Sequence, residues 1–365
     1  MPRARRDSGR SPGSTTRRSR TRSSTRYAGA STPWPELRSR GSVDPANAGD
    51  GTRPGRDGTV RLGDRVFGGL AKGSGITLLL IMAAIAVFLT IRAVVAISRD
   101  EGNFLTTFEW DANSHPPVFG IAVLLFGTVV SSLIAIVLAM PVAVGIALFI
   151  SHYAPRRLAA PIGYLVDLLA AVPSIVYGLW GALYLVPRLT GFYEWLDHLF
   201  GWTGILSYNG TPARSLMSVG ILLAIMILPI ITSVTREIFR QTPRAHQEAA
   251  LALGATRWEV ITTTVLPFGR SGIISATMLG LGRALGETMA VATVLSPSFL
   301  INASLLESGG GTFAQNIASQ FKEATSMGRD ALIASGLVLF VLTLLVNGAA
   351  RLIIARRREY AGNAG

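Results

Sequence analysis

The sequence predicts an all-α, polytopic membrane protein with six transmembrane helices and a disordered, basic N-terminal tail. Hydrophobic residues make up 49% of the 365 residues, and the mean hydropathy is +0.43. Only 15% of the residues are charged, whereas soluble domains usually carry about a quarter. Most of the net charge of +13 lies before residue 73, which is typical of a membrane protein with a basic tail.

The N-terminal tail is predicted over residues 1–58, which consist mainly of Arg, Ser, Thr, Gly and Pro. Such a segment cannot bury enough apolar surface to offset the entropy lost on ordering. No folded module follows that would use the Arg clusters on nucleic acid, so contact with anionic lipid or a retention signal is favoured. A cleaved signal peptide is not expected, because the apolar core begins only after residue 74.

Residues 59–73 are expected to form a short amphipathic helix on the cytoplasmic membrane surface. Six apolar runs follow, each long enough to cross ~30 Å of hydrocarbon at ~1.5 Å per residue. Together they form a transmembrane domain over 74–355, with a cytoplasmic tail at 356–365. The expected spans are about 74–98, 119–150, 159–187, 215–238, 268–296 and 331–354. Prolines in the second and third runs predict tilting or kinks.

The loop charges predict the orientation of the chain. Arg and Lys dominate the N-terminal tail, the loops after the second and fourth spans, and the C-terminus, whereas the other loops contain at least as many acidic residues. Because basic loops stay in the cytoplasm, both termini and the loop at 239–267 are predicted to lie there. The protein is expected in the bacterial cytoplasmic membrane.

The longest polar helical stretch between apolar runs covers residues 241–267. Ala- and Leu-rich sequence up to Leu253 favours a helix, and Gly254 suits a left-handed turn that ends it. The sequence from Thr256 to Glu259 fits a capping box that starts a second helix, which Pro267 is expected to stop. A helix–Gly–helix hook of this kind can fit a groove on another protein, although an ordinary amphipathic connector remains an alternative.

This stretch resembles the EAA loop of ABC importer permeases. The family pattern is EAA, three residues, Gly, nine residues, and I-x-L-P, and Thr264 replaces the Ile here. The resemblance implies that the loop docks on a cytoplasmic ATPase and passes its movement to the membrane helices. The matching residues are Glu248, Ala249, Ala250, Gly254, Leu266 and Pro267.

Two ionisable residues lie in the second half of the fifth run. Arg283 lies about 22 Å along the expected helix, near mid-membrane, and Glu287 is four residues further, on the same helical face. A charge at this depth should face a cavity or a partner. An arginine that guards an anion path and is oriented by Glu287 is favoured, because Arg matches oxyanion geometry and stays charged. A purely structural ion pair is the alternative.

Three residues of the third run are further candidates for the pathway or for a kink. Asp167 lies in its inner half, where it could pair with a basic residue of another helix or face a wet cavity. Pro173 frees a backbone carbonyl in mid-span and is followed by Ser174, a pattern typical of a lining segment or a kink.

The segments AVPSIVYGLWG and LGLGRALGETMAV resemble the phosphate-specific transport (Pst) permeases, and residues 59–355 are similar to the PstC-type subunit. The resemblance implies a type I ABC importer permease-like fold and ATP-driven import of inorganic phosphate. It also implies the partners: a homologous second permease, a dimeric cytoplasmic ATPase that holds ATP and Mg, and an extracytoplasmic phosphate-binding protein. The transport-critical Arg and Glu of the family fall on Arg283 and Glu287.

No catalytic residue, metal site or cofactor is expected on this chain, and no nucleic acid. There is no cysteine, which excludes thiolate zinc sites and cysteine nucleophiles, and the four histidines are scattered in predicted loops. The nucleotide-binding pattern GxxxxGK[ST] is absent. The alternatives are a permease for another oxyanion, such as sulfate or molybdate, and a stand-alone secondary anion transporter.

Overall fold

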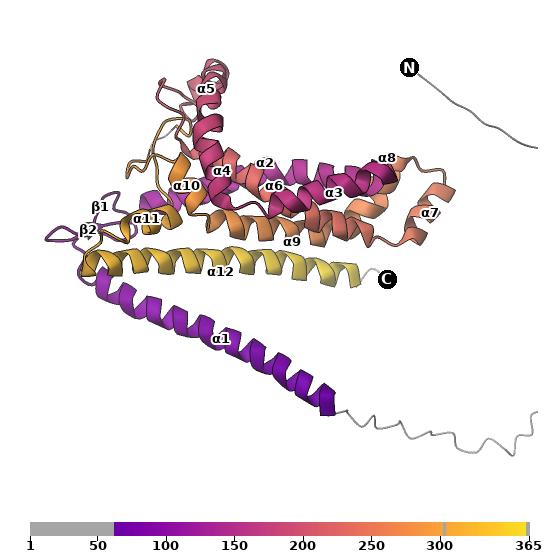
Figure 1. The fold of residues 1–365 in the computed structure, drawn as a ribbon, viewed down its shortest axis with the longest axis horizontal. Coiled ribbons are helices and arrows are strands. Elements are labelled where there is room, and N and C mark those ends of the chain that lie inside the picture. Colours follow the sequence, from indigo (N-terminus) through magenta and orange to yellow (C-terminus); the bar gives the residue numbers. More distant parts are fainter. Residues whose placement is uncertain (1–61, 302–303, 363–365) are drawn as a thin grey trace, which may run out of the picture. The chain divides into compact units, whose positions relative to one another are not determined.

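The computed structural model describes residues 62–301 and 304–362. The tail predicted over residues 1–58 lies outside the described residues, as do residues 59–61 of the expected interfacial helix. The chain divides into a unit over residues 1–65 and a unit over residues 66–365, and nearly all of the described residues belong to the second unit. This unit consists of helices and one small antiparallel pair of strands (Figure 1).

The helices follow one another along the chain with short connections. The long helices are α1 (Leu62–Ile97), α2 (Ala122–Leu148), α6 (Leu216–Arg240), α9 (Leu266–Leu285) and α12 (Ser326–Gly362). The shorter helices are α3 (Arg156–Ala170), α4 (Ser174–Trp180), α5 (Val186–Phe200), α7 (Arg244–Ala252), α8 (Arg257–Val260), α10 (Met289–Val294) and α11 (Phe313–Gln320). Three π-helical segments extend neighbouring helices, at Phe149–Tyr153, Gly181–Leu185 and Ile261–Val265, and a 3-10 turn covers Gly201–Thr203. Strand β1 (Trp110–Asp111) pairs with β2 (Val118–Phe119), with Trp110 opposite Phe119.

Every apolar run of the sequence is helical over most of its length, but the runs do not all form single spans. Four helical segments are long and apolar enough to cross a membrane, at Val66–Ile97, Ala122–Tyr153, Leu216–Arg240 and Ser326–Leu352. The third expected run is instead a pair of helical segments bent by 90°. The fifth run, which holds α9 with its two arginines, does not meet the same test. The six-span layout therefore stays a prediction.

Helix α1 differs from the expected separation into an interfacial piece and a span. The described residues run from Leu62 to Ile97 as one helix, without a break at residue 73. The glycines of this region lie in open space, so they interrupt no packing against other elements. The helix is mostly unburied, and its buried residues Ala93 and Ala96 lie near its C-terminal end. There Arg92 forms an ion pair with Asp330 of α12 at 3.3 Å.

The main core lies between α2 and α6, which make the most extensive helix–helix contact of the described residues. Ala135, Ala139 and Ala143 form a buried row at four-residue spacing on α2. On α6, a Cβ at Gly220 would lie 2.5 Å from the Ile134 side chain. Small residues allow close approach of the two backbones, which is how helices associate in lipid.

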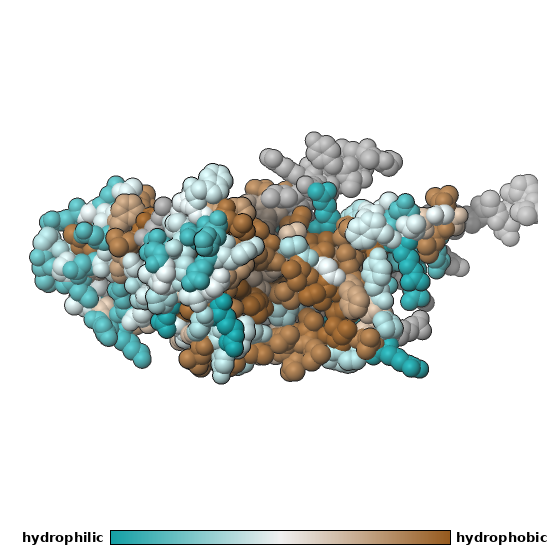
Figure 2. Space-filling model, turned by 90° about the horizontal axis from the view of Figure 1, so that it is seen from above, coloured by the Kyte–Doolittle hydropathy of each residue, from teal (hydrophilic) through white to brown (hydrophobic). Residues whose placement is uncertain are grey.

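The surface of the second unit shows the pattern of a membrane protein. Figure 2 shows hydrophobic residues gathered over the middle of one face and hydrophilic residues toward both ends. Large apolar side chains that would be buried in a soluble protein are exposed on several helices, among them Leu80 on α1, Leu133 on α2 and Leu345 on α12. An apolar surface of this extent requires a lipid or protein environment.

Candidate functional site

The hook predicted after α6 is present and is formed by α7 and α8. Helix α7 ends in a left-handed turn at Gly254, which has a φ of 88°. The N–H of Gly254 donates to the Leu251 carbonyl at 2.9 Å, and the N–H of Ala255 donates to the Ala250 carbonyl at 3.1 Å. Glycine is suited to this conformation because it has no Cβ.

The capping box at the start of α8 is confirmed. The N–H of Glu259 donates to Thr256 Oγ1 at 3.3 Å, and the N–H of Thr256 donates to Glu259 Oε2 at 2.7 Å. The Thr256 hydroxyl donates to the same carboxylate oxygen at 2.9 Å. These hydrogen bonds from the Thr256 backbone and side chain lower the pKa of the Glu259 carboxyl. The box fixes the angle at which the chain leaves the Gly254 turn.

The prediction that Pro267 stops the second helix is wrong. Helix α8 continues through the π-helical segment Ile261–Val265 directly into α9, and Pro267 lies in the first turn of α9. In the π segment the N–H of Leu266 donates to the Ile261 carbonyl, so the wider turn changes the hydrogen-bond register just before the proline. Proline is tolerated in a first turn, and residues 257–285 therefore form one continuous helical rod.

The outer surface of the hook is open. Glu248 and Ala249 are exposed, and Ala250 is half-buried. Three large apolar side chains stand beside them: Leu251, Leu253 and Trp258 are 50%, 89% and 59% exposed. A cavity of about 160 Å³ lies between the hook and the π-helical segment that follows α2, and it is lined by His152, Tyr153, Gln247, Leu251, Arg257, Val260 and Ile261. Exposed apolar residues with a charged neighbour are typical of a protein-binding surface.

The expected pairing of Arg283 with Glu287 is not formed. Helix α9 ends at Leu285, Gly286 follows as its C-cap, and α10 begins only at Met289. Since the helix breaks between the two residues, the four-residue spacing does not place them on one face. Glu287 is 8% exposed, and its Oε1 accepts from the N–H of Ala290 at 3.2 Å, at the start of α10.

Arg283 is thereby left without an acidic partner. Its side chain is exposed in the last turn of α9 and forms no hydrogen bond or ion pair within residues 62–301 and 304–362. Its charge acts electrostatically on the Tyr177 hydroxyl of α4, a residue to which no sequence signal assigned a role. Tyr177 itself donates to the Leu169 carbonyl at 2.9 Å. The guanidinium is thus free to meet an anion beside the α4 helix.

The bend between α3 and α4 occurs at the predicted kink. Helix α3 ends at Ala170, and Pro173 is the N-cap of α4, directly before Ser174. Helix α4 then packs closely on α10: a Cβ at Gly178 would lie 2.4 Å from Thr293 Oγ1 and 2.8 Å from Ala290 Cα. The bend therefore brings the broken third run beside the broken fifth run.

Asp167 has a basic partner on another helix, one of the two alternatives that the sequence left open. Arg236 of α6 donates to both of its carboxylate oxygens, and the shorter distance is 3.0 Å. The Arg236 side chain is 12% exposed and that of Asp167 is 47% exposed. No sequence signal identified Arg236 as the partner, because the two residues are 69 positions apart.

The fold and these features define a membrane-embedded transport subunit: a bundle of apolar helices with an exposed helical hook at one end and an unpaired cation at a helix break. A family model described as "Binding-protein-dependent transport system inner membrane component" matches residues 139–359. The chain belongs to this family. The predicted helical membrane permease fold is confirmed, and the protein is a multi-pass membrane permease subunit.

Individual relatives are similar over most of their length. The "Phosphate transport system permease protein PstC 2" of Mycobacterium tuberculosis is 48% identical over 301 residues, covering 80% of this chain and 92% of the relative. The PstC of Mycobacterium leprae is 47% identical over 277 residues, covering 74% and 87%. The PstC of Xylella fastidiosa (strain Temecula1) is 41% identical over 299 residues, covering 78% and 91%.

Proposed function

We propose that this chain is the PstC-type permease subunit of an ATP-driven importer of inorganic phosphate. The observation that carries this proposal is the unpaired Arg283 at the break between α9 and α10. A planar, permanently charged guanidinium suits a tetrahedral oxyanion. The relatives that are similar over most of this chain are named as phosphate transport permeases. Their names support phosphate as the anion.

The exposed hook, with Glu248, Ala249, Ala250 and Gly254 on α7 and its terminal turn, is proposed to dock on a cytoplasmic ATPase. The proposed complex has a second, homologous permease, two ATPase subunits that bind ATP and Mg, and an extracytoplasmic phosphate-binding protein. Both termini and the hook lie on the cytoplasmic side of a bacterial cell membrane in this proposal. The positive charge of the loops around the hook supports this orientation.

The transport step follows from the connectivity of the hook. Its second helix is continuous with α9 through Leu266 and Pro267, so a movement of the ATPase displaces the helix that carries Arg283 in its last turn. Phosphate released at the outer face meets this guanidinium beside α4. Glu287 is not the counter-ion that orients Arg283 here. Its carboxylate holds the start of α10 instead, and its proposed role is to keep the helix break in place.

Phosphate uptake by the complex reconstituted in liposomes tests the proposal. Arg283→Ala is expected to lower ATP-dependent uptake at least tenfold, and Arg283→Lys to recover only part of it, since lysine lacks the planar fork. Arg270→Ala is the matched control, because Arg270 is an exposed arginine near the other end of the same helix. Wild-type uptake by Arg283→Ala would contradict the assignment.

The same liposomes separate the two alternatives. A permease for another oxyanion would take up sulfate or molybdate in preference to phosphate. A secondary transporter would move phosphate without the ATPase subunits. The proposed importer does neither: phosphate uptake requires ATP and is not displaced by an equal concentration of sulfate.

A further inference from the structure

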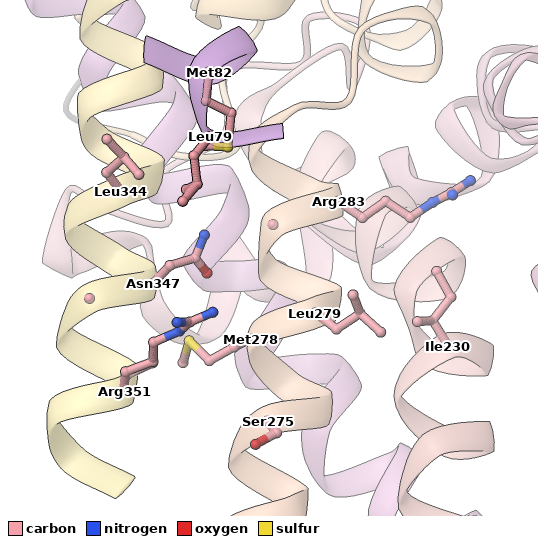
Figure 3. A pocket seen from close by; sticks show the side chains of 13 residues that line it. Leu79, Met82, Ile230, Ser275, Met278, Leu279, Arg283, Leu344, Asn347 and Arg351 are labelled. Atoms are coloured by element: carbon pink, nitrogen blue, oxygen red, sulfur yellow. The ribbon is translucent and has the colours of Figure 1, made fainter. Parts of the chain in front are cut away.

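A second feature of the membrane region is a groove that extends from Arg283 to the C-terminal part of α12, where it has a second cation, Arg351. A cavity of about 1020 Å³ lies against α9 and is bounded by residues of α1, α6 and α12. Its walls are mainly apolar and include Leu79 and Met82 of α1, Met278 and Leu279 of α9, and Leu344 of α12. In Figure 3, Leu79, Met82, Met278 and Leu344 surround the space between α9 and α12, and Leu279 lies on the side of α9 that faces Ile230.

Two polar side chains of α12 enter this groove. Asn347 and Arg351 are four residues apart, so they lie on one face of the helix. In Figure 3 both extend from α12 toward α9, and both line the cavity. Arg351 is exposed and has no hydrogen-bond or ion-pair partner among the residues that the structure describes. Arg283 also lines the cavity, but its side chain extends from α9 on the side away from α12 in Figure 3.

The position of Arg351 along α12 indicates how deep it lies in the membrane. Asp330 marks one end of α12, where it pairs with Arg92. The apolar run begins at residue 331, and Arg351 lies about 30 Å further at ~1.5 Å per residue, which equals the hydrocarbon thickness. Given the orientation in the proposed function, on which this step rests, Arg351 lies at the level of the inner-leaflet phosphates.

The apolar walls decide between the possible anions. A phosphate ion makes no favourable contact with the apolar side chains of Leu79, Met82 and Leu344, and it would lose hydration free energy beside them. A phospholipid matches both parts of the groove, because its acyl chain is apolar and its phosphate is anionic. Basic pockets between transmembrane helices on the cytoplasmic side are typical sites for anionic headgroups. The buried attachments of α1 lie near its C-terminal end, which leaves the inner end of the groove open to lipid.

We propose that this groove binds an anionic phospholipid of the inner leaflet. Its phosphate accepts hydrogen bonds from Arg351 and the Asn347 amide, and one acyl chain lies along Leu79, Met82 and Leu344. The second permease is the competing occupant, but the cation at headgroup depth favours the lipid. A lipid bound here would contact α1, α9 and α12 at once.

The complete transporter, purified from membranes that contain phosphatidylglycerol and phosphatidylcholine, tests the proposal by native mass spectrometry of retained lipid. Arg351→Gln is expected to lower retained phosphatidylglycerol at least fivefold, and Asn347→Leu about twofold, without change in phosphatidylcholine. Arg329→Gln is the matched control, because Arg329 is on the same helix near its other end and stacks over Phe321. Equal retention of phosphatidylglycerol by Arg351→Gln and the wild type would overturn the proposal.

Two further measurements exclude the other occupants. Excess inorganic phosphate should leave the bound phosphatidylglycerol in place, and displacement would assign Arg351 to the phosphate path instead. Because the chain has no cysteine, Leu344→Cys introduces a unique thiol in the groove. A photoactivatable phosphatidylglycerol should label this region, whereas a thiol cross-link to the second permease would overturn the lipid assignment. Lipid retention needs no transport, so failure here is distinguishable from failure of the proposed phosphate import.

Discussion

Arg236 of α6 binds Asp167 of α3 through a single nitrogen, Nη2, which lies 3.2 Å and 3.0 Å from the two carboxylate oxygens. Gly163, one turn before Asp167 on α3, leaves room for the guanidinium: a Cβ there would lie 2.2 Å from Arg236 Nη1. The Arg236 Nε is buried and has no hydrogen-bond partner among the described residues. The ion pair therefore fixes α3 against α6 close to the helix end from which the hook departs.

Asp167→Asn should destabilise the protein. The substitution leaves the mostly buried Arg236 without a counter-charge, but the 47% exposure of Asp167 reduces the effect, so we expect a loss of about 1–2 kcal/mol. Thermal unfolding of the complex in detergent measures this loss. The exchanged pair, Asp167→Arg with Arg236→Asp, should recover part of the stability. Unchanged unfolding of Asp167→Asn would show that the pair contributes nothing.

Gly163→Ala should have the opposite effect from Gly145→Ala. A Cβ at Gly163 would lie 2.2 Å from Arg236 Nη1, so the guanidinium must move, and we expect its ion pair with Asp167 to weaken. A Cβ at Gly145 on α2 meets nothing within 4 Å, so alanine there should stabilise the helix, by up to ~1 kcal/mol. The midpoint of thermal unfolding should fall for the first variant and stay equal or rise for the second. The same shift for both would contradict the packing seen around Arg236.

Gly254→Val should uncouple ATP hydrolysis from transport. The φ of 88° at Gly254 is strained for a β-branched residue, so the turn between α7 and α8 changes shape while the membrane helices keep their packing. The measurement is phosphate imported per ATP hydrolysed by reconstituted complex, expected to fall several-fold. Ala252→Val, two residues earlier within α7, is the control and should keep a near-normal ratio. A normal ratio for Gly254→Val would argue against docking through the hook.

The capping box should open in acid. Its hydrogen bonds lower the pKa of Glu259 from the ordinary value of 4.5, so the carboxylate binds a proton less readily in the folded state. Its contribution to stability is thus complete above about pH 4.5 and is lost as the pH falls through the lower, folded-state pKa. Hydrogen exchange of residues 256–260 measures this. Glu259→Ala should exchange faster than the wild type at pH 7, and the difference should shrink toward pH 3; a constant difference would exclude this carboxylate as the cause.

The hook could be predicted because its signals are local. Gly254 and the Thr256–Glu259 box each specify a backbone geometry within a few residues, and the structure has both. The prediction that Pro267 ends the helix was wrong. A proline ends a helix only where its missing N–H leaves a carbonyl unpaired or its ring clashes with the preceding turn, and the π turn before Pro267 avoids both. Local rules cannot show such a change of hydrogen-bond register.

The membrane pairings were predicted less well because they depend on tertiary structure. Helical spacing placed Arg283 beside Glu287, but a break at Gly286 separates them. The partner of Asp167 is on a helix far along the chain, and the groove with Arg351 needs α1, α9 and α12 to converge. Charge and hydropathy along one sequence identify residues that need partners, but they do not identify the partners.

The unbroken helix through residues 257–285 has a mechanical consequence. Its length is roughly 40 Å at about 1.5 Å per residue, and glycines that favour bending lie just beyond its two ends, at Gly254 and Gly286. This helix is therefore expected to move as one rigid body, with bending confined to the two glycines. In the proposed function, a rotation of the hook at Trp258 would therefore be transmitted along this helix to Arg283 and would change the direction of its guanidinium.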